Sequence, residues 1–186
     1  MANIFVQKNQ GKVVKAFVLG AGSALEQKMI EEGKIVLHEN GEYEIFSQEA
    51  NSGAGEVAVA GKYCKIDNKG RPYPNDPEYF IPNHRHIEGD EYEQIPQPLA
   101  AWEATEEKDE VVQYLIDTGK LVISEDDESK YFGAMLWGAW LTAAKDAVVI
   151  FYDVKRDEEG NITFVDFNFV AREEFNLTYH YYQSSN

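Results

Sequence analysis

The sequence has 186 residues, of which 33 are Asp or Glu and 17 are Lys or Arg, so its formal charge is −16. This length allows one ordinary domain or two small ones, and a hydrophobic content of 44% excludes a chain that is disordered throughout. So acidic a surface is a poor match for nucleic-acid phosphates and for anionic lipid. We therefore expect basic proteins as partners, including the grooves that normally hold nucleic acid.

Cysteine content and hydropathy restrict the chain further. Cys64 is the single cysteine, which excludes an internal disulfide and a zinc site made of several cysteines. The first residues lack the basic and apolar pattern of a signal peptide, and the longest apolar stretch, 132–141, is too short to span a bilayer. We expect a soluble, cytoplasmic protein that binds no membrane.

The first half predicts a strand, a helix, two short strands, a hairpin and a second helix. The first helix begins at the capping residue Ser23 and ends before Gly33, where a left-handed residue is usual. The hairpin turns at residues 67–70. The expected elements are a strand over 13–19, apolar helix positions from Leu25 to Ile30, a strand over 35–37, a second strand ending at Phe46, hairpin arms starting with 57–66, and a helix near 76–83.

The second half predicts the same elements in the same order. Its helix is capped by Thr105 or Asp109 and ends before Gly119, and its hairpin turns at residues 157–160. The expected elements are a strand over 99–104, a helix containing Val111 to Ile116, a strand over 121–123, a second strand ending at Phe132, hairpin arms over 147–155 and 162–170, and a helix near 171–178.

The two halves also resemble each other residue by residue. Residues 27–46 and 113–132 are identical at eight of 20 positions without a gap, at an offset of 86. Residues 56–71 match 146–161 at an offset of 90, and 14–17 match 99–102. The expected fold class is therefore α+β: two related tandem copies of a small strand-helix-strand-hairpin unit with antiparallel sheets, covering residues 1–90 and 91–186.

The negative charge is concentrated in one segment. Residues 88–128 hold 14 acids and 2 bases, so these 41 residues carry 12 of the 16 excess negative charges. A solvated face that aids solubility is the usual explanation, and an anionic docking surface is the alternative. The candidate docking residues are Glu88, Asp90, Glu91, Tyr92, Glu93, Trp102, Glu103, Glu106, Glu107, Asp109, Glu110, Glu125, Asp126, Asp127 and Glu128, with Tyr92 and Trp102 as possible anchors.

No catalytic arrangement stands out in the sequence, and we expect no cofactor and no metal. His84 and His86 lie two residues apart, and Glu88, Asp90 and Glu91 follow, so a His/carboxylate metal site is one alternative to a plain polar linker. Cys64 lies within a predicted strand and aligns with Val154, which indicates a small buried side chain. The run 20–23 lacks the spacing of a phosphate-binding loop and fits the start of a helix. An extra apolar run, 135–141 with Trp137 and Trp140, occurs only in the second half; we expect core or an interface between the copies there, and an exposed partner-binding patch is the alternative.

One segment resembles a known group of proteins. The stretch GKYCKIDNKGRPYPN at 61–75, followed by Phe80, His84, YEQ at 92–94 and PLAAW at 98–102, is similar to a segment of small proteins from Firmicute phages and mobile elements. It resembles an anti-CRISPR group that inhibits type II-A Cas9. The resemblance implies a non-enzymatic inhibitor that acts by protein–protein contact inside a host bacterial cell, and it assigns no functional residue.

Three functions remain open from the sequence. The first is inhibition of a Cas9-type nuclease by an acidic surface that occupies a basic nucleic-acid groove. The second is a small metal-dependent enzyme of a mobile element, centred on His84 and His86. The third is an accessory structural protein of a phage.

Overall fold

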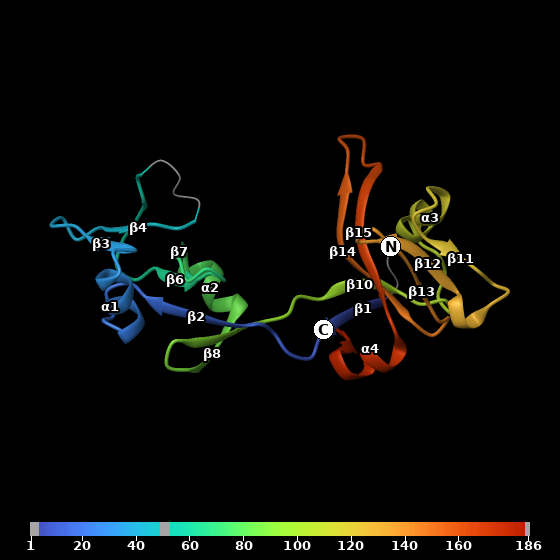
Figure 1. Ribbon diagram of the computed structural model, residues 1–186, viewed down its shortest axis with the longest axis horizontal. Helices are drawn as coiled ribbons and strands as arrows, with labels where there is room; N and C mark the ends of the chain where they lie inside the picture. Colours follow the sequence, from blue (N-terminus) through green and yellow to red (C-terminus); the bar gives the residue numbers. More distant parts are fainter. Residues whose placement is uncertain (1–3, 49–52, 185–186) are drawn as a thin grey trace. The chain divides into compact units, whose positions relative to one another are not determined.

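The computed structural model describes residues 4–48 and 53–184, which divide into two units (Figure 1). The first unit comprises residues 11–95, and the second comprises residues 4–10 together with 96–184. As predicted, the fold is α+β, with four α-helices and antiparallel sheets in the described residues. The division differs from the expected boundary at 90/91, because the strand over 91–94 pairs with the strand that begins at Val13.

The first unit contains a five-stranded sheet, a three-stranded sheet and two helices in its described residues. Its elements in chain order are β2 (Val13–Val18), α1 (Ala24–Glu31), β3 (Ile35–Leu37), β4 (Tyr43–Ile45), β5 (Glu56–Ala58), β6 (Tyr63–Ile66), β7 (Pro72–Asn75), α2 (Pro77–Asn83), β8 (His84–Glu88) and β9 (Glu91–Gln94). The larger sheet has the order β7-β6-β2-β9-β8, and the smaller has the order β3-β4-β5. Every neighbouring pair is antiparallel.

The second unit uses strands from both ends of the chain. Its elements are β1 (Ile4–Lys8), β10 (Leu99–Trp102), α3 (Glu110–Asp117), β11 (Val122–Ile123), the 3₁₀-helix η1 (Glu128–Lys130), β12 (Phe132–Leu136), β13 (Ala139–Ala143), β14 (Val148–Arg156), β15 (Ile162–Val170), α4 (Arg172–Thr178) and β16 (Tyr179–Tyr181). The larger sheet has the order β15-β14-β10-β1-β16, and the smaller has the order β11-β12-β13. In Figure 1, β14 and β15 form the long orange-red hairpin of this unit.

The five-stranded sheets of the two units have corresponding strand orders. β10 occupies the middle of its sheet as β2 does, and β14 and β15 correspond to β6 and β7. On the other side of the middle strand lies β9 in the first unit and β1 in the second. The registers agree as well, because Tyr92 lies opposite Val14 and Val6 lies opposite Leu99. The sequence did not predict β1 as a strand.

The helix ends follow the predicted local signals. The side chains of Ser23 and Asp109 each accept a hydrogen bond from the backbone N–H three residues further along, at 3.1 and 2.9 Å. Asp109 rather than Thr105 is therefore the cap of α3. Gly33 and Gly119 follow the two helices with φ of 69° and 70°, a left-handed conformation that costs glycine little.

Two predicted strands are wrong. The strand expected to end at Phe132 is instead β12, which begins at this residue and runs to Leu136. The stretch 57–66 forms two strands in different sheets, β5 beside β4 and β6 beside β2. Gly61 separates them with φ of 96°, and its N–H donates to the carbonyl of Leu19 at 2.9 Å. The turn that follows is as predicted, since Asp67 Oδ1 accepts hydrogen bonds from the N–H groups of Lys69 and Arg71.

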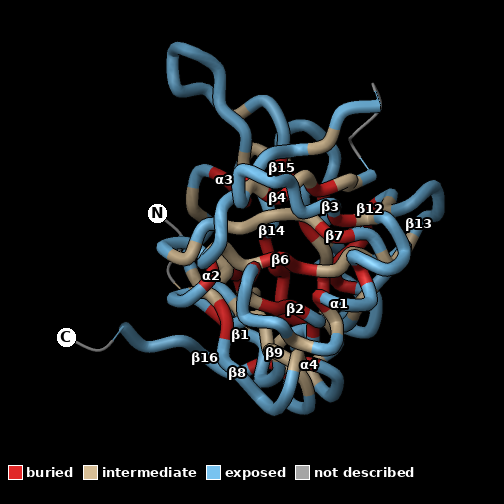
Figure 2. Tube along the Cα trace, turned by 90° about the vertical axis from the view of Figure 1, so that its left-hand side faces the viewer, coloured by how far each residue is buried: buried red, intermediate tan, exposed pale blue. Residues whose placement is uncertain are grey.

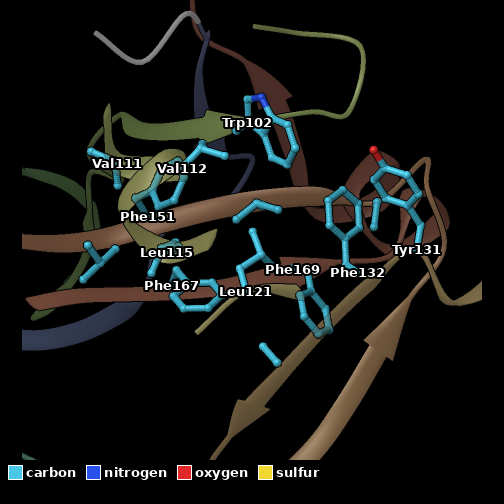
Figure 3. Close-up of a cluster of buried hydrophobic side chains, with 14 residues drawn as sticks. Trp102, Val111, Val112, Leu115, Leu121, Tyr131, Phe132, Phe151, Phe167 and Phe169 are labelled. Carbon is cyan, nitrogen blue, oxygen red and sulfur yellow. The ribbon is translucent and has the colours of Figure 1, made fainter. Parts of the chain in front are cut away.

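Each unit has its own hydrophobic core. Figure 2 shows buried segments along β2 and β6 and exposed connecting turns. The core of the first unit includes Phe17, Leu19, Met29, Ile35, Ile45 and Cys64. The larger core of the second unit joins α3, the small sheet and the β14–β15 hairpin through residues including Trp102, Val112, Leu115, Leu121, Phe132 and Phe167 (Figure 3). None of the helices in the described part of the chain has the length and apolar character needed to cross a bilayer.

Removal of β1 tests how much the second unit depends on this strand. Val6 is fully buried and β1 pairs with both β10 and β16, so deletion of residues 1–8 would expose both neighbours. We expect amides of the second unit to lose their slow hydrogen exchange, while those of the first unit keep it.

A permuted chain is the matched control. The N–H of Tyr182 donates to the carbonyl of Phe5 at 2.9 Å, so residues 1–10 appended after Asn186 can re-form β1 through a short connection. This permutant should recover slow exchange in the second unit. Full protection in the deletion variant would contradict the dependence on β1.

Candidate functional site

The candidate docking acids fall into two groups on different units. The hairpin acids lie in and around the β8–β9 turn of the first unit: Glu88, Asp90, Glu91 and Glu93. The loop acids lie in the second unit: Glu103, Glu106, Glu107, Asp109, Glu110, Glu125, Asp126, Asp127 and Glu128. The segment that is continuous in sequence thus provides two acidic surfaces. Both units are negative, with 15 acids and 9 bases in the first and 18 acids and 8 bases in the second.

Most of the hairpin acids surround a shallow hollow. Glu88, Asp90 and Glu91 line it together with Lys15 and Leu25. The β8–β9 turn is fixed against β2 because the N–H of Ala16 donates to the carbonyl of Asp90 at 2.9 Å. These carboxylates therefore belong to an ordered turn.

Glu93 has a different, structural role. Its Oε1 accepts a hydrogen bond from the N–H of Gly11 at 2.9 Å, and its other oxygen pairs with Arg85. The Gly11 N–H, followed by Arg85, lowers the pKa of Glu93 below its usual range. Glu93 thus stabilises the start of β2 and is a weak candidate for contact with a partner.

Three of the loop acids around α3 also have intramolecular partners. Asp109 caps α3, and Glu110 pairs with Arg156 of β14, whose hydrogen bond lowers the pKa of Glu110. Glu103 is largely buried and accepts hydrogen bonds from Arg172 at 2.6 Å and from Tyr181. These contacts connect the loop after β10 to the hairpin, α4 and β16.

The remaining loop acids include the most exposed carboxylates. Asp127 accepts hydrogen bonds from Ser129 and Glu128 pairs with Lys145 at 3.3 Å, whereas Glu125 and Asp126 are exposed and form no ion pair in the described residues. A second hollow is lined by residues from three loops: Ala104, Thr105, Glu128, Ser129, Ala144, Lys145 and Asp146. The loop holding Glu106 and the turn holding Glu125 therefore flank one depression on the second unit.

Neither predicted aromatic anchor is exposed. Trp102 is 3% exposed and lies in the core against Phe132, as Figure 3 shows, with its Nε1–H donating to the carbonyl of Glu106 at 3.2 Å. Tyr92 is half-buried and packs edge-on against Phe80, with ring centroids 5.1 Å apart. The continuous apolar run at 99–102 was the sequence signal that Trp102 belongs to a core strand.

The aromatic residues of 135–141 are exposed rather than buried as predicted. Trp137, in the turn between β12 and β13, is 78% exposed with φ of 49°. Met135 lies opposite Trp140, and both are more than half exposed. The indole of Trp140 covers Gly133, where a Cβ would come within 2.5 Å of Trp140 Cζ2. Gly133 thus makes room for an aromatic ring on the outer face of the small sheet.

The histidine pair serves structural contacts. His84 is stacked on Phe80 with ring centroids 3.9 Å apart, and its Nδ1 lies 2.9 Å from the Phe80 carbonyl. His86 is exposed and its Nε2 lies 2.8 Å from the carbonyl of Gly89. Within the described residues, no group of three or more His, Cys, Asp or Glu is placed to hold a metal ion.

Cys64 is fully buried in β6, in agreement with the sequence analysis. Burial, followed by the charges of Glu26 and Glu56, raises the pKa of its thiol to about 12. The thiol therefore stays protonated at neutral pH and lacks the thiolate character that nucleophilic catalysis needs.

Comparisons with known protein families, with curated proteins and with solved structures gave no match.

The buried His84 predicts a pH dependence of stability. Burial lowers the pKa of His84 below its usual 6.5, with a smaller opposing effect of the Phe80 carbonyl and a further lowering by Lys65. Below about pH 6.5 the unfolded chain binds a proton that the folded chain does not, so stability falls as the pH falls, by at most about 1.4 kcal/mol per pH unit from this group.

The variant His84→Phe keeps the stacked ring and removes the titrating group. Chemical denaturation of both proteins between pH 7.5 and 5 measures the effect, and other titrating groups cancel in the difference. The stability of the variant relative to the original should rise as the pH falls. A difference that is constant with pH would contradict this explanation.

Proposed function

We propose that the protein is a non-enzymatic inhibitor that docks an acidic surface on the basic groove of a nucleic-acid-binding effector. The observation that carries the proposal is a group of carboxylates on the two segments that border one hollow of the second unit: Glu125 and Asp126 are exposed, Glu106 is half-buried, and none of the three has an ion-pair partner in the described residues. Glu88, Asp90 and Glu91 form a comparable surface on the first unit.

Electrostatics supports a basic groove as the target. Carboxylates on ordered turns present fixed negative charge, and complementary charge speeds association and selects the partner. The acids that have intramolecular partners hold these turns in place, which limits the entropy lost on binding. Phosphate-binding grooves offer the matching positive charge.

The choice of a Cas9-type nuclease comes from the resemblance of the segment at 61–102. Cas9-type effectors hold nucleic acid in a positively charged channel and read the short motif beside the target with Arg side chains. An acidic protein that occupies this channel excludes DNA without performing chemistry. The proposed site of action is accordingly the cytoplasm of a bacterial host.

We also propose that the two units arose by internal duplication. Support comes from the corresponding strand orders, the equivalent caps at Ser23 and Asp109, and the turns at Asp67 and Asp157, which share the same hydrogen-bond pattern. In this proposal β1 supplies the strand that would otherwise follow β16. The copies then differ in charge and in their exposed aromatic residues.

Charge reversal of the acids beside this hollow tests the docking proposal. The triple variant Glu106→Lys, Glu125→Lys, Asp126→Lys changes the charge by six units and leaves the cap Asp109 and the ion pair of Glu110 intact. We expect binding to a purified type II-A Cas9 to weaken at least tenfold, or about 1.4 kcal/mol. Inhibition of DNA cleavage should weaken in parallel, and affinity of the original protein should fall as salt rises.

The matched control reverses three exposed acids elsewhere, Glu31→Lys, Glu39→Lys and Glu158→Lys, for the same change in charge. This control should bind Cas9 within a few-fold of the original, because its charges lie outside both acidic surfaces. Equal weakening of the two variants would show that total charge, not a docking surface, governs binding. A Cas9 that binds the original protein with no dependence on salt would contradict the electrostatic mechanism.

A further inference from the structure

The first unit contains a cleft that is lined by three lysines and one aspartate, although the protein as a whole is strongly negative. The cleft encloses about 340 Å³ and is lined by Lys12, Val13, Val14, Lys15, Lys65, Ile66, Asp67, Asn68, Tyr73 and Gln94. β2 pairs with β6 only over Ala16–Val18 and with β9 only over Val13–Lys15. The cleft therefore opens where β6 separates from the first half of β2, at the β6–β7 turn.

Lys65 is the unusual residue of this cleft. It is 7% exposed, and lysine is almost never buried to this degree without a charged partner. In the described residues its ammonium has neither an ion pair nor a hydrogen-bond acceptor; its one recorded contact is the ring of Tyr73, whose centroid lies 5.8 Å away. The ammonium is open to the cleft, so its three N–H donors are free to bind solvent or a ligand oxygen there.

The other charges of the cleft do not neutralise Lys65. Lys12 donates to Asn68 Oδ1 at 3.1 Å and adds a second positive charge. Asp67 also lines the cleft and brings one negative charge, but its carboxylate is held by two backbone N–H groups and Gln48 and forms no ion pair with Lys65 or Lys12 in the described residues. Lys15 lies at the rim, where the hairpin acids offset its charge.

Most other basic side chains in this unit have carboxylate partners. The recorded pairs are Lys28 and Lys34 with Glu32, Lys62 with Asp76, and Arg85 with Glu93. The first unit is negative overall, yet Lys12 and Lys65 in its cleft carry positive charges that no ion pair in the described residues compensates.

The second unit shows what this sheet position holds when no charge is needed. Lys65 of β6 lies opposite Ala16, and Ile150 of β14 lies opposite Ala101, so the strand pairing makes Ile150 the counterpart of Lys65, whereas the sequence alignment at an offset of 90 predicted Lys155. Ile150 is fully buried among Phe175 and Tyr179. A hydrophobic side chain suits this position, so packing of the sheet does not require a lysine here.

We propose that this cleft is a binding site for a small oxyanion, a phosphate or a carboxylate group, held by the ammonium groups of Lys65 and Lys12. The ligand oxygen accepts the unused N–H donors of Lys65 in a partly desolvated setting, where a charge-assisted hydrogen bond is strong. Burial, and then the charge of Lys12, lowers the pKa of Lys65, and a bound anion would raise it again.

Titration of the full chain with inorganic phosphate, and separately with acetate, tests the site. Backbone amide signals of Asn68, Tyr73 and Gln94 are followed by NMR at constant ionic strength, with sodium chloride as the reference. We expect saturable shifts at these residues with at least one of the two anions. Saturation by phosphate alone assigns the site to phosphate groups, and saturation by acetate alone assigns it to carboxylates.

Two variants at Lys65 and one control complete the test. Lys65→Met keeps the aliphatic stem and Lys65→Ile introduces the side chain found at the corresponding position, so at least one should fold. Each folded variant should bind at least tenfold more weakly, whereas Lys28→Met, which removes the same charge outside the cleft, should bind like the original. The proposal is overturned if neither anion gives saturable shifts, or if a folded Lys65 variant binds within twofold of the original.

Discussion

The second unit depends on a strand from the opposite end of the chain. β1 lies between β10 and β16, and Val6 is fully buried among Ala101, Val148 and Ile150. Without β1, the backbone donors and acceptors of both neighbours on that side would lose their partners. The first unit, by contrast, obtains the corresponding strand from its own hairpin. Because β1 belongs to the second unit, residues on both sides of 11–95 belong to that unit, and the first unit is one continuous segment between them.

Local sequence signals predicted the helix ends and tight turns, whereas strands that pair with distant parts of the chain could not be predicted from them. The caps at Ser23 and Asp109 and the turns at Asp67 and Asp157 depend on a few adjacent residues, so the sequence contains them directly. β1 is a short strand whose partners lie about 90 residues or more away. Its position follows from packing that no local pattern encodes. The gapless alignment of the two halves also misses a difference in turn length. Leu37 pairs with Tyr43, whereas the aligned residue Ile123 pairs with Phe132, so the turn of the second unit is longer.

The sequence shows where the acidic segment lies but does not show which of its carboxylates are structural and which face solvent. A carboxylate that caps a helix and one that faces solvent look alike in sequence, and only the partner distinguishes them. Glu103, Glu93 and Asp109 have such partners, whereas Glu125 and Asp126 have no ion pair in the described chain. The structural acids therefore hold the turns on which the exposed ones lie. Trp102 shows the same limit, because an aromatic residue among acids proved to be core.

The layer between the large sheet and the second helix is where the two units differ most in chemistry. In the second unit this layer is apolar, with Ile150 packed among Phe175 and Tyr179. In the first unit the corresponding positions hold Lys65 and His84, and the enclosed Nε2 of His84 has no hydrogen-bond partner. Buried polar groups without partners cost free energy that a purely structural layer would avoid. The two units thus share a framework but differ in charge: exposed acids lie on the second unit, whereas lysines line the cleft of the first.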